Sequence, residues 1–259
     1  MKLVTLGDVL LDVIVRSDGP LAAGDDRAVE TSAGPGGQAA NVAAWAAALG
    51  AEARVVACVG ADAAGELVVR ALRELGVDVV GPVAGRTGIV VSISAAGDRT
   101  MASDRGSAPE LAAHDLDATW FDCDVLHVSG YALLRDTSAD AALTAARFAR
   151  SRGARVSLDV SSSALAGDDF RARARELHPD LSFATERERE AAGDLDTRWV
   201  LKRGAGGLTV DGRDYPTPPT AVVDTTGAGD ALAAGFFVGG PELAVETAAR
   251  CCTQPGAMP

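Results

Sequence analysis

Short apolar runs of strand character alternate with helical stretches along nearly the whole chain, and this alternation restricts the fold more than any other feature. The order strand, helix, strand is typical of a mainly parallel sheet with helices on both faces, so we expect a doubly wound α/β fold. Gly50, Gly76 and Gly153 stand where glycines commonly end helices. The expected strands are residues 2–7, 54–59, 125–129, 156–160, 181–183, 198–202, 208–210 and 213–215. The expected helices are residues 38–49, 66–75, 138–150, 168–176 and 242–250.

Two segments interrupt the alternation. Residues from about 13 to 32 are rich in turn residues, and residues from about 86 to 105 suggest a β-hairpin that turns near Ala96-Gly97. Such β excursions can pair into a small lid over a ligand site, although an extension of the sheet edge fits the pattern almost as well. Because the sequence has no repeat and no low-complexity linker, we expect residues 1–259 to form one domain with the lid inserted in it.

The charge of the chain excludes some partners. Its 24 basic and 36 acidic residues give a net charge of −12, and the basic residues are scattered, so nucleic acid is not expected as a partner. No apolar window approaches the ~20 residues of a membrane span, and the first residues lack a signal cleavage site, so we expect a cytoplasmic protein without membrane contact. The cysteines have no metal-ligand spacing. An acidic protein can still bind phosphates through clustered backbone N–H groups.

Such a cluster is expected at residues 224–230. A glycine-rich turn opens an apolar helix there, so the N–H groups of Gly227, Ala228 and Gly229 can converge into an anion hole at the positive end of the helix dipole. Asp230 lies at its rim and could accept a proton from an attacking hydroxyl. An ordinary helix start with an aspartate in its first turn is the structural alternative.

A second glycine turn leads into the helix at residues 38–49. Gly36 and Gly37 allow a ligand to approach the backbone, and Asn41 can donate to and accept from hydroxyl groups. Asp12 follows the first strand, at the end of the sheet where open α/β proteins bind ligands. These groups suit a polyol, although Asn41 could simply be a helix residue and Asp12 a solvated acid.

These stretches resemble the three signatures of the ribokinase-like, or PfkB, carbohydrate kinases. Gly7 to Asp12, Gly36-Gly37-x-x-x-Asn41 and the segment 224–230 occur in the family's order and span the chain. The resemblance implies an ATP-dependent kinase that uses Mg²⁺ and has a β lid over the sugar.

By this resemblance Asp230 is the catalytic base, and the amides of residues 227–229 form the anion hole. Asp12 and Asn41 hold sugar hydroxyls, with Gly36-Gly37 beside them. Asp224 and the Thr226 carbonyl resemble ligands of a monovalent cation, which would be K⁺.

Two further segments resemble the family's nucleotide side. Thr185-x-x-Glu188 is similar to the family's Asn-x-x-Glu motif near Mg²⁺ and phosphate, with Thr in place of Asn. It is also a capping-box pattern, which would only start a helix. Lys202, Gly204 and Gly207 resemble the strand-to-loop segment beside the nucleotide, where Lys202 could reach a phosphate. A solvated lysine is the alternative.

The acceptor cannot be read from these motifs. Residues 104–108 faintly resemble a stretch of 2-keto-3-deoxygluconate and fructose kinases, in which Arg105 would meet a carboxylate or a hydroxyl of the substrate. A surface arginine is the alternative. Family members usually extend somewhat further than residue 259, which leaves the adenine pocket least defined. In this family lids often pair across a dimer, and residues 13–15 and 89–93 could do so here.

Other nucleotide-binding classes fit less well. Positions 34–39 match a loose dinucleotide fingerprint, but they do not directly follow the first strand. Residues 60–65 resemble a P-loop, but Glu66-Leu67 replaces the required Lys-Ser/Thr, and Asp62 is expected to cap the next helix instead. We therefore predict an ATP-dependent sugar kinase. A nucleoside kinase of the same family and a non-catalytic sugar or nucleoside sensor stay open.

Overall fold

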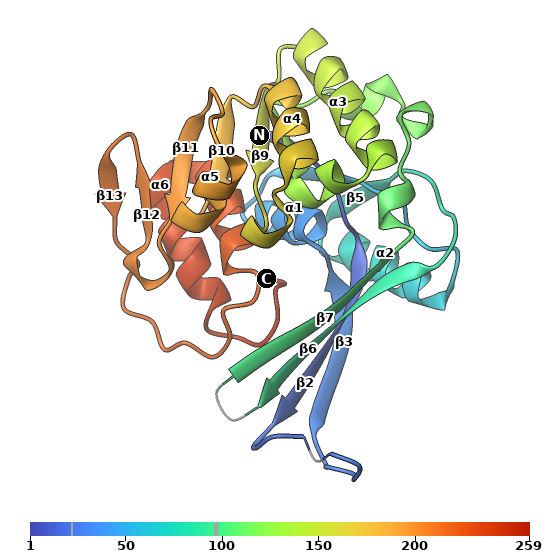
Figure 1. Cartoon of the computed structure of the whole chain (residues 1–259), viewed down its shortest axis with the longest axis vertical. Helices are drawn as coiled ribbons and strands as arrows, with labels where there is room; N and C mark the ends of the chain where they lie inside the picture. Colours follow the sequence, from blue (N-terminus) through green and yellow to red (C-terminus); the bar gives the residue numbers. More distant parts are fainter. Residues whose placement is uncertain (22, 96–97) are drawn as a thin grey trace.

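The computed structural model describes residues 1–21, 23–95 and 98–259, and its main sheet has nine strands over these ranges (Figure 1). Their order is β13-β12-β11-β10-β9-β8-β1-β4-β5. The strands from β11 to β5 run parallel, and β12 and β13 add an antiparallel hairpin. The bounds are β1 Lys2–Leu6, β4 Glu52–Val56, β5 Val77–Val80, β8 Val125–Ser129, β9 Arg155–Asp159, β10 Leu181–Ala184, β11 Arg198–Lys202, β12 Leu208–Val210 and β13 Arg213–Tyr215.

Helices cover both faces of this sheet. Side chains of β1 alternate between the faces, so that Leu3 packs in one core layer and Val4 and Leu6 in the other. The Leu3 layer is completed by α1 (Gln38–Ala48), α2 (Ala63–Glu74) and α6 (Ala228–Cys251). The opposite layer is completed by α3 (Asp136–Ser151), α4 (Asp168–Leu177) and α5 (Glu186–Ala192). Short 3-10 helices are η1 Ala108–Glu110, η2 Ala113–Asp115, η3 Ala118–Phe121, η4 Gly130–Leu134, η5 Ser163–Leu165 and η6 Gly204–Gly206. The expected doubly wound fold is confirmed.

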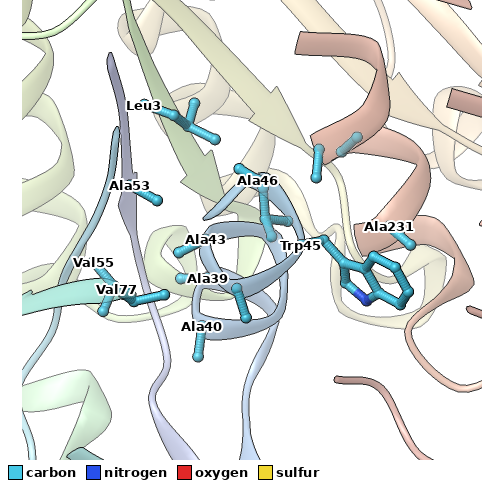
Figure 2. Packing of buried hydrophobic residues seen from close by; sticks show 14 of the residues in the cluster. Leu3, Ala39, Ala40, Ala43, Trp45, Ala46, Ala53, Val55, Val77 and Ala231 are labelled. Atoms are coloured by element: carbon cyan, nitrogen blue, oxygen red, sulfur yellow. The ribbon is translucent and has the colours of Figure 1, made fainter. Parts of the chain in front are cut away.

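Small residues allow α1 and α6 to pack closely. Helix α1 is built mostly of alanine, and Trp45 fills the space beside Ala231 of α6 (Figure 2). The buried indole donates from Nε1 to the carbonyl oxygen of Ala257 at 2.8 Å. This contact holds the C-terminal segment against the first turn of α6, where the anion hole was expected.

Most element bounds agree with the sequence predictions within a few residues. Asp62 caps α2, because its Oδ1 accepts from the Gly65 amide at 2.9 Å. Strand β5 was missed, because its four residues directly follow the helix-ending Gly76. The helix expected at 242–250 is the second half of α6, which is interrupted at Gly240 and Pro241.

The two β excursions form a sheet of their own, which we call the lid. Its order is β3-β2-β6-β7, with β2 and β6 parallel at its centre. The bounds are β2 Leu10–Ser17, β3 Glu30–Gly36, β6 Thr87–Ala95 and β7 Asp98–Gly106. The expected pairing of the two segments is confirmed, and the alternative of an extended main-sheet edge is wrong. Figure 1 shows the lid projecting from the layered core. The hairpin turn expected at Ala96-Gly97 lies outside the described residues.

Candidate active site

The first turns of α1 and α6 meet at the candidate site. Asn41 Nδ2 donates to Asp230 Oδ2 at 2.7 Å. Desolvation raises the pKa of the Asp230 carboxyl to about 7, since the hydrogen bond from Asn41 offsets the loss of water only in part and nearby Asp159 adds repulsion. A carboxyl with this pKa can accept a proton near neutral pH. The structure therefore brings together the predicted base and one of the predicted sugar ligands.

A second amide contact to Asp230 was missed in the sequence. Gln38 Oε1 accepts hydrogen bonds from Ser129 Oγ at 2.5 Å and from Ser161 Oγ at 2.6 Å. With its oxygen held in this way, the Gln38 side chain presents its NH₂ group to the Asp230 carboxyl, with which it hydrogen bonds. Ser129 ends β8 and Ser161 closely follows β9. Polar residues at strand ends are a signal that could have found both serines.

The predicted anion hole lies at the start of α6. Gly227 has φ of 77°, and a Cβ there would lie 2.6 Å from Ala257, so glycine is required. The Ala228 amide donates to the Thr225 carbonyl at 3.3 Å, and the unpaired amides of the first helical turn leave positive charge at this end of α6. Lys202 Nζ lies 3.8 Å from the position of a Cβ at Gly229. A lysine therefore lies beside the predicted anion hole.

Lys202 is held by two carboxylates. Its Nζ lies 3.0 Å from both oxygens of Asp159 and 3.4 Å from Glu188 Oε2, and its side chain is only 13% exposed. Desolvation would lower the pKa of Lys202, but the charges of Asp159 and Glu188 raise it above the ordinary value. The alternative of a solvated lysine is therefore wrong. Asp159, 1% exposed at the end of β9, was not identified from the sequence.

The Thr185 and Glu188 pair forms the capping box of α5. Thr185 Oγ1 accepts from the Glu188 amide at 3.3 Å, and Glu188 Oε2 accepts from the Thr185 amide at 2.7 Å. The capping interpretation is confirmed, and Glu188 also contacts Lys202. Gly207 has a packing reason as well, because a Cβ there would lie 2.0 Å from the Tyr215 carbonyl. Nucleotide roles for Thr185, Gly204 and Gly207 stay predictions.

The residues predicted to hold the acceptor lie where the lid joins the core. A Cβ at Gly36 would lie 2.1 Å from Asp12 Cγ, so the glycine makes room for that carboxyl. Gly37 has φ of 95°, and a Cβ there would lie 2.4 Å from the Asp8 carbonyl. Desolvation raises the pKa of Asp12 to about 7. Asn41 Oδ1 is buried without a hydrogen-bond partner among the described residues, so it can accept from a ligand hydroxyl.

Arg105 contacts a residue that the sequence did not single out. Its Nε donates to Asp8 Oδ2 at 2.7 Å and its Nη2 to Asp8 Oδ1 at 2.5 Å. The guanidinium also lies 5.5 Å from the centre of the Tyr131 ring. The surface-arginine alternative is wrong, because Arg105 is mostly buried in this pair.

Asp224 and Thr226 shape the turn before α6. Asp224 Oδ1 accepts from the Thr226 amide at 2.9 Å and from Thr226 Oγ1 at 2.7 Å, while Oδ2 accepts from the Gly256 amide at 3.0 Å. The Thr226 carbonyl accepts from the Cys251 thiol at 3.3 Å. Their role as cation ligands stays a prediction. Within the described ranges, no cluster of three His, Cys, Asp or Glu residues could enclose a metal ion.

The chain is similar in sequence to proteins of known family. Residues 1–206 match the pfkB family carbohydrate kinase model, a range that ends before the segment 224–230. An ATP-dependent ribose-1-phosphate kinase of Halopiger xanaduensis is 31% identical over 276 residues, covering 97% of this chain and 90% of that protein. A fructokinase of Salmonella typhimurium is 28% identical, with 91% and 83% covered.

Solved structures show the same architecture over the whole chain. Adenosine kinase from Sinorhizobium meliloti superposes with a TM-score of 0.87 at 25% identity, covering 100% of this chain and 95% of that one. An E. coli protein described as a ribokinase II, in complex with ATP and Mg²⁺, superposes with a TM-score of 0.84 at 22% identity, covering 99% and 94%.

The nine-stranded sheet of the described residues, with its layers of helices and its lid, is the fold of ribokinase-like kinases. The chain belongs to the pfkB family of carbohydrate kinases, and the prediction of a kinase that acts on sugars or nucleosides is confirmed at that level. Among the helices of the described residues, none is both long and apolar enough to cross a membrane.

Proposed function

We propose that the protein transfers the γ-phosphoryl group of ATP to a hydroxyl of a small carbohydrate, with Asp230 as the catalytic base. The observation that carries this proposal is the Asp230 carboxyl itself, which has a pKa of about 7 and lies at the N-terminus of α6. Two side-chain amides, from Asn41 and Gln38, hold it in place. A base near an anion hole is what in-line phosphoryl transfer requires of a protein.

The acceptor would lie between Asp12 and Asp230. The Asp12 carboxyl and the unpaired Asn41 Oδ1 both accept hydrogen bonds, so both can hold hydroxyl groups of a sugar. Asp230 would take the proton of the attacking hydroxyl as the oxygen approaches the phosphorus. The lid, which carries Asp12, would exclude water that competes as acceptor.

The nucleotide phosphates would lie at the start of α6. The amides of Gly227, Ala228 and Gly229 and the ammonium of Lys202 would neutralise charge that develops on the transferred group. When bound, Mg²⁺ supplies further positive charge at the phosphates, and it needs only one or two protein carboxylates because it keeps water and phosphate oxygens as ligands. Asp159 and Glu188, both beside Lys202, fit that requirement. The E. coli protein of this fold in complex with ATP and Mg²⁺ supports the use of these two cofactors.

A nucleoside is the second candidate acceptor. Similarity to the Sinorhizobium meliloti adenosine kinase favours it, and Tyr131 is an aromatic ring near the acceptor side on which a base could stack. A non-catalytic sensor has less support, because such a protein would not need the Asp230 carboxyl, whose desolvation keeps its pKa near neutrality.

Release of ADP across a panel of sugars and nucleosides tests this function. With Mg²⁺ and K⁺ present, we expect turnover with one acceptor class. Asp230→Ala and the isosteric Asp230→Asn should lower kcat at least ~100-fold, the lower range for loss of a positioned base. Binding of the acceptor, measured by calorimetry, should change little in the same variants. Near wild-type turnover in Asp230→Asn would exclude the mechanism.

We further propose that K⁺ activates the enzyme through Asp224 and the Thr226 carbonyl, which would hold the turn before α6. Replacing K⁺ by a bulky organic cation at constant ionic strength should then lower kcat. Unchanged turnover in the absence of K⁺ would exclude activation.

We also propose that residues 1–259 work as one domain that pairs with a second copy through the lid. The lid face that carries Val13, Val15 and Ile93 is apolar, and Ile89 on that face is 37% exposed. A monomeric mass in light scattering would exclude this pairing.

A further inference from the structure

The ion pair between Asp8 and Arg105 joins the core to the lid. Asp8 follows β1 and its side chain is 4% exposed, whereas Arg105 lies near the end of β7 and is 20% exposed. Both carboxylate oxygens are occupied, by Nε at 2.7 Å and by Nη2 at 2.5 Å. A bidentate pair of this kind is strong and fixes the orientation of the guanidinium plane.

This pair lies on the acceptor side of the site. In the lid, Asp12 pairs with Val90, and Val90 pairs with Ser103. Arg105 is two residues beyond Ser103 and therefore points to the same face of the lid as Asp12. The backbone of Asp8 also lies against Gly37, in the glycine turn that leads to Asn41. Arg105 is thus the cation that an acidic group on the acceptor would approach.

An acidic acceptor would be disfavoured in either of two arrangements. If Arg105 turned away to bind a phosphate or a carboxylate, the buried Asp8 carboxylate would lose its ionic partner, which is costly inside a protein. If Arg105 stayed on Asp8, the acidic group would approach the carboxyls of Asp8, Asp12 and Asp230. The charge of the Arg105 guanidinium would already be neutralised by Asp8. An uncharged hydroxyl group meets neither cost, and a guanidinium N–H that does not bond Asp8 can donate to it.

We propose that Asp8 determines acceptor specificity: by occupying Arg105 it directs the site to uncharged polyhydroxy acceptors and rejects sugars that carry a phosphate or a carboxylate. This inference rests on the proposed function, because it assumes that the acceptor lies between Asp12 and Asp230. According to this inference, Asp8 together with Arg105, and not Arg105 alone, selects the charge of the acceptor that can bind.

Matched pairs of ligands test the inference by binding alone. The dissociation constants of ribose and ribose 1-phosphate, and of fructose and fructose 1-phosphate, would be measured by calorimetry without nucleotide. The wild-type protein should bind the neutral member at least tenfold more tightly. Asp8→Asn should shift the ratio of the two constants at least tenfold toward the phosphorylated member, because Arg105 then keeps its full charge for the ligand. Each ratio comes from a single variant, so a loss of folded protein cancels.

Two further variants make the test specific. Asp104→Asn breaks the neighbouring pair with Arg86, in which both side chains are exposed, and should leave the ratio unchanged. Adding Arg105→Gln to Asp8→Asn should abolish the gain for the phosphorylated sugar. Equal or tighter binding of that sugar by wild-type protein, or an unchanged ratio in Asp8→Asn, would overturn the inference.

Release of ADP separates this inference from the proposed function. Turnover of the phosphorylated member in preference to the neutral one would overturn the role of Asp8 and leave the kinase function intact. The expected shift in the ratio of dissociation constants, without ADP release in the presence of any of the sugars, would support the role of Asp8 and contradict phosphoryl transfer.

Discussion

Asn41 and Asp230 are 189 residues apart in the chain, yet Asn41 Nδ2 donates to Asp230 Oδ2 at 2.7 Å. The hydrogen bond joins the first turns of α1 and α6, so the predicted sugar ligand and the predicted base hold each other. Because Asn41 stabilises the charged form of the carboxyl, it also sets the pH range over which Asp230 can accept a proton.

The first prediction concerns pH. Asp230 must be ionised to act as a base, and its pKa is raised to about 7, so kcat/KM should fall roughly tenfold for each pH unit below 7 and level off above it. Asn41→Leu removes a hydrogen bond that lowers this pKa, and the acid limb should move to higher pH. Initial rates from pH 5.5 to 9 measure both effects.

Asp12 also has a pKa of about 7 and must be separated from Asp230 in this experiment. The acid limb that remains in Asp12→Asn belongs to Asp230. A profile that is flat from pH 5.5 to 8 in wild-type enzyme would contradict the assignment of the base.

Gln38 should act as a positioning residue for Asp230. Gln38→Leu removes the amide that Ser129 and Ser161 orient, so we expect kcat to fall on the order of tenfold, a fraction of the loss expected for the base itself. KM for the acceptor should change little, and the acid limb should move upward in pH because the Gln38 hydrogen bond lowers the Asp230 pKa. If Gln38→Leu lowered the free energy of unfolding but left the pH profile of the rate unchanged, the role of Gln38 would be purely structural.

Two glycines of β3 provide a matched pair of variants. A Cβ at Gly36 would overlap the Asp12 carboxyl at 2.1 Å, whereas a Cβ at Gly34 meets no atom within 4 Å. Gly36→Ala should therefore displace Asp12 and raise KM for the acceptor at least ~10-fold, with KM for ATP unchanged. Gly34→Ala should behave as wild type in the same steady-state assay. Similar KM values in the two variants would exclude a role for Asp12 in acceptor binding.

Lys202→Met should affect both stability and nucleotide binding. It leaves the buried Asp159 without its ionic partner, which costs about 3–5 kcal/mol in the free energy of unfolding. KM for ATP should rise because the cation beside the anion hole is lost. Lys2→Met, which removes an exposed pair with Asp122, serves as the control and should leave both urea unfolding and KM unchanged.

The cap of α5 predicts a change in stability alone. Thr185→Ala removes the side-chain acceptor for the Glu188 amide and should cost about 1 kcal/mol in thermal or urea unfolding. Thr185→Asn restores a capping side chain and should recover that loss. If Thr185→Asn is less stable than Thr185→Ala, the capping interpretation is wrong.

The local features of this protein could be predicted from the sequence. The alternation of elements, the cap at Asp62 and the capping box at Thr185 depend on residues close together in the chain, so short patterns determine them. The glycine turns before α1 and α6 were found for the same reason. Each also indicated where polar side chains would meet a ligand.

The contacts among distant residues were decided only by the tertiary structure. Gln38 is 91 residues from Ser129, and Asp8 is 97 residues from Arg105. Their pairing depends on the strand order, which places β8 between β1 and β9, and on where the lid joins the core. The sequence therefore indicated candidate site residues such as Asp230 and Asn41, whereas Asp8, Gln38 and Asp159 were added only by the tertiary structure. Folding decided which residues are buried together. Burial raises the pKa of Asp230 because removing water disfavours the charged carboxyl, and it strengthens the ion pair that holds Arg105 on Asp8.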